Sequence, residues 1–342
     1  MPRICIVPRV GGPGGMTSFR LKFEQGLRAR GIDVTYALSQ PAEAVLLIGG
    51  TRQLLLLWKA KRRGARLVQR LDGINWVQRA RWTGLRYHLR AEYGNAMLAF
   101  LRARFAEGVV YQSKFIHRWW DEWYGAARVP ASVILNGVDL MDYAPAGETV
   151  ALGGFRKSPT PPYRLLVIEG SLAGGLNSGL FSAIRLAQAL DKRYPMEIVV
   201  AGRVDQRSQV TALKQSHVPL QFLGVIERQR VPGLMRSAHL LFSAEVNPPC
   251  PNSVIEALAC GLPVVGFDSG ALSELVAGDA GRVVPYGGNP WKLDPPDIPA
   301  LAAAAAEILS DQPRFRQAAR ARAESALGVD KMVDQYIKVL LD

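Results

Sequence analysis

The chain has 342 residues, of which 49% are hydrophobic, 21% charged and 8% aromatic. This length and apolar content are enough for two buried cores, and they predict two domains rather than one. No apolar run approaches the ~20 residues that a membrane-spanning helix needs, and the N-terminal segment lacks the apolar core of a signal peptide. These features predict a cytoplasmic protein.

The net charge of +13 is distributed unevenly. Residues 1–150 hold 22 Lys and Arg against 11 Asp and Glu, whereas the remaining residues hold 20 against 18. The first half therefore carries most of the basic field, which favours a negatively charged partner there.

The three cysteines, Cys5, Cys250 and Cys260, have neither CxxC nor Cys/His metal spacing. A disulfide framework is not expected from this odd number, and no Asp/His cluster indicates a metal site. Cys5 and Cys260 are expected to be buried small hydrophobes, and Cys250, within a proline run, to be more exposed.

The first half of the chain alternates strands with helices. Strands are expected at 3–10, 32–38, 42–50, 65–73, 107–113 and 131–139, and helices at 16–31, 75–104 and 114–125. Most of these strands are continuous apolar runs, which is typical of a parallel sheet covered on both faces. This βαβ rhythm predicts an α/β domain.

Composition changes after the Asn136-Gly137 turn. The segment APAGETVALGGFRKSPTPPY is rich in Gly and Pro and has no apolar period, so the domain boundary is placed there. The βαβ rhythm then restarts, with strands expected at 164–175, 196–204, 220–226, 239–246, 262–270 and 281–288 and helices at 179–195, 230–238 and 298–310.

The segment NPPCPNSVIEALACG, residues 247–261, sets three prolines before an apolar helix. Pro248, Pro249 and Pro251 donate no hydrogen bond and fix φ, so the loop is rigid and any anion contact shifts to the helix start. The first N–H groups of a helix and the positive end of its dipole suit a diphosphate. Asn252 or Ser253 can equally serve as a helix N-cap, and the sequence does not separate these roles.

Residues 252–285, NSVIEALACGLPVVGFDSGALSELVAGDAGRVVP, resemble the donor-site segment of the large family of retaining, nucleotide-sugar-dependent glycosyltransferases with the GT-B fold. Four further segments agree in order: GGPGG before a helix, SKFIHRWW through VILNGVDLMDYAP, VAGRV, and FLGVI. The resemblance runs through nearly the whole chain. It implies two Rossmann-like, doubly wound parallel-sheet domains facing a cleft, where residues 1–150 hold the acceptor and 151–328 the nucleotide sugar. It also implies a C-terminal helix, 329–342, that packs back on the first domain.

The resemblance implies transfer of a sugar from a UDP- or GDP-linked donor to a hydroxyl of a glycan or a lipid-linked acceptor, with retention of configuration and no cofactor. Glu256 is placed on the donor ribose and Asp72 beside the acceptor hydroxyl, where Asp72 is equally well explained as a turn residue before Gly73. The residues expected to bind the nucleotide sugar are Gly14, Gly15, Met16, Ser171, Asn177, Ser178, Arg203, Val225, Asn252, Ser253, Val254 and Glu256.

The chain departs from the family pattern at three donor-site positions. Ser171 and Ser178 stand where the family has an Arg and a Lys, and Pro248 stands where it has the first of two acidic residues. Loss of one cation on a departing diphosphate can cost ~3–4 kcal/mol. Arg203 or Arg70 could compensate. The alternative is a degenerate GT-B protein that binds a sugar, a nucleotide or a partner without catalysis.

The basic helical region of the first domain mixes arginines with Trp76, Trp82, Tyr87 and Tyr93. It can be a peripheral contact with an anionic surface at the inner face of a membrane, a groove for an anionic glycan, or solvated helix faces over core aromatics. Nucleic acid is disfavoured because no zinc-finger or RNA-binding signature is present.

Overall fold

The computed structural model describes residues 1–12, 14–150, 162–171 and 178–342. They form two compact units, Met1–Gly137 with Val329–Asp342, and Val138–Gly328. The first unit thus ends at Gly137, whereas the Gly/Pro-rich segment was expected to hold the boundary. Residues 151–161 of that segment lie outside the described residues.

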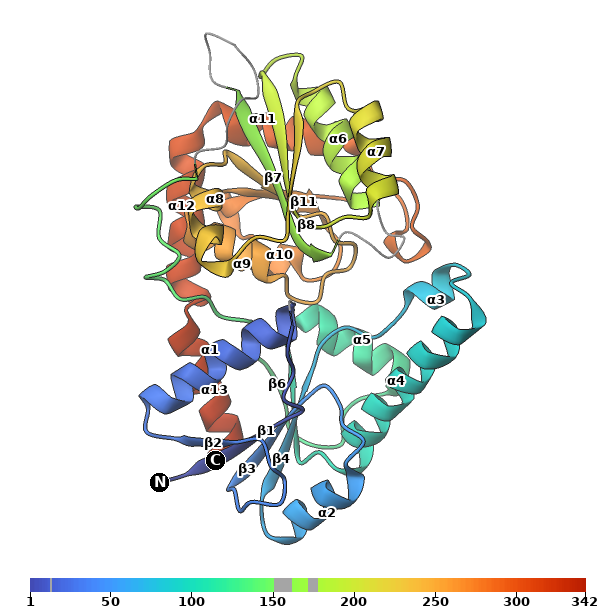
Figure 1. The fold of residues 1–342 in the computed structure, drawn as a ribbon, viewed down its shortest axis with the longest axis vertical. Coiled ribbons are helices and arrows are strands. Elements are labelled where there is room, and N and C mark those ends of the chain that lie inside the picture. The colour runs from blue at the N-terminus through green and yellow to red at the C-terminus, as the bar shows by residue number, and fades with distance from the viewer. Residues whose placement is uncertain (13, 151–161, 172–177) are drawn as a thin grey trace. The chain divides into compact units, whose positions relative to one another are not determined.

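The first unit contains a six-stranded parallel sheet in the order β2-β1-β3-β4-β5-β6 (Figure 1). Its strands are β1 (Arg3–Val7), β2 (Asp33–Thr35), β3 (Ala44–Ile48), β4 (Arg66–Leu71), β5 (Gly108–Tyr111) and β6 (Ala131–Val133). Its helices are α1 (Gly15–Ala29), α2 (Leu54–Arg62), α3 (Val77–Ala80), α4 (Leu85–Arg104), α5 (Lys114–Tyr124) and α13 (Val329–Leu341).

Helices cover both faces of this sheet, because alternate residues of each strand point to opposite sides. Ile4 and Ile6 of β1 join a core with α1 and α13, where Phe19, Phe23 and Tyr336 pack ring to ring. Cys5 and Val7 join the opposite core, with Leu57 of α2 and Leu101 of α4. The C-terminal helix therefore belongs to the first unit.

The second unit repeats this plan, with a parallel sheet in the order β12-β11-β10-β7-β8-β9. Its strands are β7 (Tyr163–Ser171), β8 (Met196–Arg203), β9 (Leu220–Gly224), β10 (Leu240–Phe242), β11 (Val264–Phe267) and β12 (Gly281–Val284). Its α-helices are α6 (Ser178–Leu190), α7 (Gln206–Gln215), α8 (Val231–Arg236), α9 (Asn252–Ala259), α10 (Leu272–Leu275), α11 (Ile298–Ser310) and α12 (Gln312–Ala326), and 3-10 turns lie at η1 (Arg228–Arg230), η2 (Gly278–Ala280) and η3 (Pro290–Lys292).

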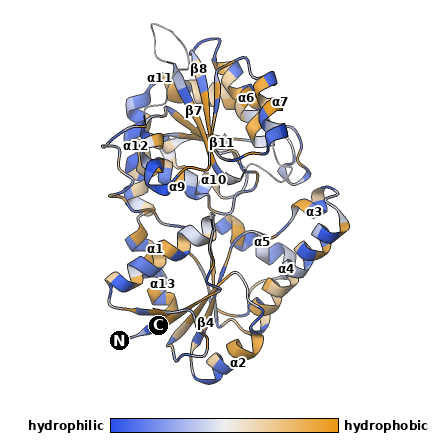
Figure 2. Cartoon of the chain, in the orientation of Figure 1, coloured by the Kyte–Doolittle hydropathy of each residue, from blue (hydrophilic) through white to orange (hydrophobic). Residues whose placement is uncertain are grey.

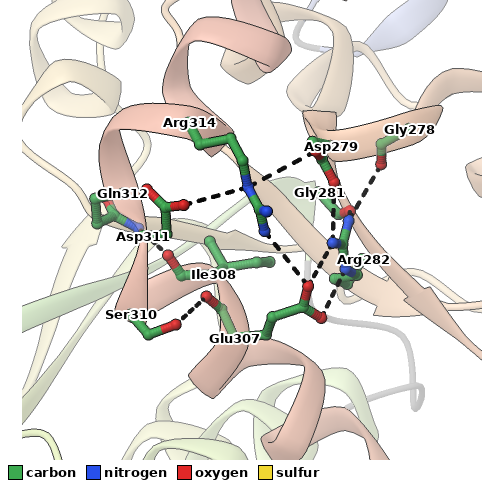
Figure 3. A network of polar contacts seen from close by, with 10 residues as sticks. All are labelled: Gly278, Asp279, Gly281, Arg282, Glu307, Ile308, Ser310, Asp311, Gln312 and Arg314. Carbon is green, nitrogen blue, oxygen red and sulfur yellow. Dashed lines mark hydrogen bonds and ion pairs between the residues drawn. The ribbon is translucent and has the colours of Figure 1, made fainter.

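The core of the second unit lies where α6, α7 and α11 meet one face of the sheet. At the edge strand β12, Arg282 joins Asp279 and Glu307 at 2.9 Å and 2.5 Å, and Arg314 extends the ion pairs (Figure 3). The Arg282 guanidinium also lies 4.5 Å from the ring centre of buried Phe315. This network ties the edge strand to α11 and α12. The two parallel α/β sheets predicted from the sequence are thus confirmed.

Candidate functional site

The order of strands in the second sheet places its topological switch point between β7 and β10. The chain proceeds from β7 through β8 to β9 on one side, then returns to β10 on the other side of β7. In open parallel sheets, ligands bind beyond the carboxyl ends of the strands at such a point. The segments that follow β7 and β10 are therefore the candidate site of this unit.

The helix that follows β10 presents unpartnered N–H groups. α9 begins at Asn252 after the N-cap residue Pro251, and its first backbone bond runs from the Ile255 N–H to the Pro251 carbonyl, at 3.3 Å. Within the described residues, the N–H groups of Asn252, Ser253 and Val254 have no hydrogen-bond partner. No side chain caps this helix, so the N-cap role considered for Asn252 or Ser253 is wrong. Three donors remain for an anion at the positive end of the helix.

The loop between β10 and α9 is held by the loop that follows β11. The Ser269 hydroxyl accepts a hydrogen bond from the Asn247 N–H at 3.3 Å, and the Pro248 carbonyl accepts one from the Ala271 N–H at 2.8 Å. Gly270, with φ +65°, lies so near that a Cβ would stand 2.3 Å from the Pro248 nitrogen. The prolines thus belong to a rigid loop that positions the start of α9.

Within this loop, Asn247 adopts a left-handed backbone with φ 54° and is only 3% exposed. Its Nδ2 has no hydrogen-bond partner among the described residues. A buried amide left unpaired costs ~1–3 kcal/mol, so this donor is a further candidate for ligand contact. Cys250, expected to be exposed, is buried at 4% exposure, and that expectation is wrong. Its position between two prolines did not reveal how the loop packs.

Glu256 lies one turn into α9 and is half-buried, while the flanking Val254, Ile255, Ala257 and Leu258 are buried as predicted. Its negative charge acts on Tyr143 and Cys260: burial and the Glu256 carboxylate raise the pKa of Tyr143, and burial raises that of Cys260 to about 12. The Arg228 guanidinium opposes the shift at Tyr143. Glu256 thus lies close to two buried side chains, those of Tyr143 and Cys260.

A second acidic feature stands at the switch point itself. Glu169, near the end of β7, lies beside Glu245, which follows β10. Burial first, and then the charge of Glu245, hold the pKa of the Glu169 carboxyl well above its usual value. Two carboxylates this close resist simultaneous ionisation. Glu169 was not predicted from the sequence, because only the strand order brings β7 next to β10.

The other predicted donor residues have separate places in the second unit. Ser171 ends β7, Ser178 begins α6, and Asn177 lies outside the described residues. Arg203, at the end of β8, and Val225, after β9, are both exposed. Within the described part of the chain Arg203 has no ion-pair partner, and it lies at the carboxyl edge, on the strand next to β7.

The remaining predicted residues belong to the first unit. Gly14 is the N-cap of α1 with φ 140°, a conformation that favours glycine, and is followed by Gly15 and exposed Met16. Asp72, after β4, is half-buried; burial raises the pKa of its carboxyl, opposed by the Arg70 charge and a Gln112 hydrogen bond.

Arg70 is 1% exposed, stacks 3.9 Å from the ring centre of Phe19 and donates to the Asn136 side-chain oxygen at 2.9 Å. Because the guanidinium is enclosed within the core of the first unit, Arg70 does not offer the exposed cation that the donor diphosphate would need. Arg203 remains the candidate. Among the described residues, no group of His, Cys, Asp and Glu is arranged to hold a metal ion.

Known structures share this arrangement over almost the full chain. Sucrose-phosphate synthase from Thermosynechococcus elongatus superposes with a TM-score of 0.71 at 16% identity, covering 99% of this chain and 98% of that one. Anabaena HepE in complex with UDP-glucose gives 0.67 at 18% identity, with 99% of each chain covered. WaaG, a glycosyltransferase involved in lipopolysaccharide biosynthesis, gives 0.68 at 15% identity, again with 99% of each covered. The fold is therefore GT-B.

Residues 165–311 match the family model for glycosyl transferases group 1. The resemblance first seen in residues 252–285 is thereby confirmed, and it extends over most of the second unit.

Two curated relatives match shorter parts of the chain. A GDP-mannose-dependent alpha-(1-6)-phosphatidylinositol dimannoside mannosyltransferase of Mycobacterium tuberculosis is 30% identical over 146 residues, which is 42% of this chain and 37% of the relative. A 2-deoxystreptamine N-acetyl-D-glucosaminyltransferase of Streptomyces fradiae is 29% identical over 122 residues, 34% of this chain and 27% of the relative. The chain thus matches about a third of the length of these relatives.

Proposed function

We propose that the protein transfers a glycosyl group from a nucleotide-diphosphate sugar to a hydroxyl of a glycan or lipid-linked acceptor, with retention of configuration. The observation that carries this proposal is the start of α9. There, three N–H groups without partners in the described chain stand beside the switch point of a sheet that matches the group 1 glycosyltransferases.

In the proposed complex, the diphosphate lies on the N–H groups of Asn252, Ser253 and Val254. Hydrogen bonds from backbone N–H groups to an oxyanion are charge-assisted and stronger than neutral ones. Glu256, one turn further into the helix, accepts hydrogen bonds from the ribose hydroxyls. Arg203 supplies the cation that Ser171 and Ser178 lack. No side-chain metal site is required by this arrangement.

The acceptor is assigned to the first unit, where Asp72 orients the incoming hydroxyl. GDP-mannose and UDP-glucose are the donors to test first, because one is named for a relative and the other is bound by a GT-B neighbour. We also propose a peripheral contact of the first unit with an anionic membrane surface. Within the described residues, no helix is both long and apolar enough to span a bilayer.

A binding module that lacks catalysis is the second candidate. The pairing of Glu169 with Glu245 favours it, because it places acidic side chains at the switch point where the transferase family has cations. Such a module would still bind a nucleotide sugar at the donor site, but the bond between the sugar and the diphosphate would not break.

The two candidates separate in a thermal-shift panel of UDP-, GDP-, ADP- and TDP-linked sugars, followed by an assay for released nucleotide. A transferase is expected to be stabilised by one donor class and to release its nucleoside diphosphate slowly. Stabilisation without release supports the module. The variant Glu256→Gln is expected to lose most of the shift, whereas Glu324→Gln, on exposed α12 surface, should match the wild type. Absence of any nucleotide response contradicts both candidates.

A further inference from the structure

The entire net charge of the protein resides on the first unit. This unit holds 24 Lys and Arg against 11 Asp and Glu, a net charge of +13, whereas the second unit holds 18 against 18. Between Ala44 and Ala91 there are eleven basic residues and a single acidic one, Asp72. The segment that contains α2, α3 and the start of α4 therefore produces a concentrated positive field.

Helix α4 has a packed side and an outward side. Ala91, Asn95 and Arg102, four and seven residues apart, are buried against the unit. Leu89, Tyr93 and Phe100 are also four and seven residues apart. They begin two residues before Ala91, which at 100° per residue places them on the opposite side of the helix. These three side chains are 60%, 50% and 44% exposed. An apolar stripe thus faces away from the core of its own unit. Figure 2 shows that α4 carries both hydrophobic and hydrophilic residues.

Arginines flank this stripe. Arg86, Arg90 and Arg104 are exposed, and within the described part of the chain they have no ion-pair partner. Glu92 is the one acidic residue of α4, and its carboxylate is already bound to Arg79 at 2.6 Å. The positive charge beside the stripe is therefore not neutralised by the helix itself.

Helix α2 extends the surface. Leu55, Trp58, Lys59 and Arg62, at helical spacing, are exposed, and the Arg62 guanidinium lies 4.6 Å from the Trp58 ring centre. α2 and α4 contribute to the same core on one face of the first sheet. The Arg52 guanidinium, just before α2, lies 5.5 Å from the ring centre of Tyr93 and so links the two helices.

We propose that the outward sides of α4 and α2 bind the surface of an anionic lipid bilayer. Leucine and aromatic side chains enter the boundary between head groups and acyl chains, while the arginines contact lipid phosphates, as in interfacial amphipathic helices. A soluble polyanion would match the charge but leave Leu89 and Phe100 in water. This surface deepens the peripheral contact proposed above, but it requires neither the donor nor the acceptor for its test.

The test is co-sedimentation of the full chain with vesicles of phosphatidylcholine alone or mixed with phosphatidylglycerol. We expect binding to the mixed vesicles, weakening as salt is raised from about 0.1 M to about 1 M. Each arginine near an anionic membrane surface contributes ~1 kcal/mol, which corresponds to about 5-fold in affinity. Replacement of Arg86, Arg90 and Arg104 by Gln should therefore weaken binding about 100-fold. The double change Leu89→Ser and Phe100→Ser should also weaken it, at low salt and at high salt.

The matched control is Leu213→Ser with Arg207→Gln, which alters an exposed leucine and an exposed arginine of α7 in the neutral second unit. This control should bind vesicles like the wild type, and circular dichroism checks that all variants are folded. Equal binding by the triple arginine variant, no vesicle binding by the wild type, or binding of a soluble anionic glycan without vesicle binding would each overturn the proposal. Because the vesicles contain no nucleotide sugar, failure here is independent of failure of the transferase assay.

Discussion

Gly179 and Ala244 meet at the switch point of the second sheet. A Cβ built on Gly179 would stand 2.2 Å from the carbonyl oxygen of Ala244, a distance that no side chain tolerates. Gly179 lies in the first turn of α6, and Ala244 follows β10 at the start of the loop that leads to α9. Their contact fixes the start of α6 against the loop that leads to α9.

Gly179→Ala is therefore expected to destabilise the second unit. The obstructing atom belongs to the backbone and cannot rotate away, so the cost should be that of overpacking, ~1–3 kcal/mol. Gly170→Ala, in β7, is the matched control, because a Cβ there meets nothing within 4 Å. Chemical denaturation measures both free energies of unfolding. Equal stability of the two variants would show that α6 shifts freely relative to this loop.

The role of the α9 N–H groups can be separated from that of the Asn252 side chain. Pro251 has ψ 119°, which is compatible with a following proline, and proline is well tolerated at the first position of a helix. Asn252→Pro therefore removes one N–H and leaves the helix intact, whereas Asn252→Ala keeps the N–H and removes the amide side chain.

With a nucleoside diphosphate as ligand, Asn252→Pro is expected to weaken binding about 10-fold, corresponding to ~1.4 kcal/mol for one charge-assisted hydrogen bond. Asn252→Ala should change it far less. Isothermal titration calorimetry makes the comparison. If the alanine variant loses as much affinity as the proline variant, the side chain rather than the backbone is the contact.

The two sheets were predictable because their strands are short apolar runs between Gly and polar turns. AVLLI at β3 and EIVVA in β8 are examples of strands covered on both faces. Helices α2, α7 and α10 were missed. α7 carried a usable signal, since the Asp205 side chain accepts a hydrogen bond from the Ser208 N–H as an N-cap. α2 was hidden because a run of four leucines has no clear period.

The site was only partly predictable. Burial around Glu256 follows from its apolar neighbours and needed no structure. The pairing of Glu169 with Glu245 depends on β10 lying beside β7, which the order of strands along the sequence does not specify. The burial of Asn247 likewise depends on the loop after β11, where its partner Ser269 lies 22 residues further along the chain.

Glu169 makes the stability of the second unit depend on pH. Its carboxyl has a pKa well above the usual 4.5 in the folded protein, so the native state holds the proton more tightly than the unfolded chain does. The contribution of protonated Glu169 to the free energy of unfolding is complete below pH 4.5. It is lost as the pH rises through the elevated pKa of the folded protein. Glu169→Gln should therefore raise the melting temperature at pH 8 more than at pH 5.

Differential scanning calorimetry at these two pH values provides the measurement. Glu227→Gln, an exposed position in the same unit, is the control and should leave the pH dependence unchanged. A Glu169→Gln melting curve that retains the wild-type pH dependence would mean that Glu169 is ionised in the folded protein across this range.

His239 makes stability depend on pH in the opposite direction to Glu169, because its contribution is lost as the pH falls. Burial first, and then the Arg316 and Arg164 guanidinium groups, lower its pKa from 6.5 to about 4, while its Nδ1 accepts a hydrogen bond from the Arg164 N–H at 2.9 Å. Because the folded protein holds this imidazole neutral, its stabilisation is present above pH 6.5 and is lost as the pH falls towards 4. A shift of this size corresponds to ~3 kcal/mol.

His239→Asn keeps a side-chain acceptor for the Arg164 N–H but has no ionisable group. The variant should therefore lose less stability than the wild type between pH 7 and pH 4, when free energies of unfolding are measured by urea denaturation at each pH. His217→Asn, at an exposed position in the same unit, is the matched control and should follow the wild-type curve. Parallel curves for wild type and His239→Asn would require that His239 becomes protonated without cost, and hence that neither burial nor the guanidinium groups of Arg316 and Arg164 lower its pKa.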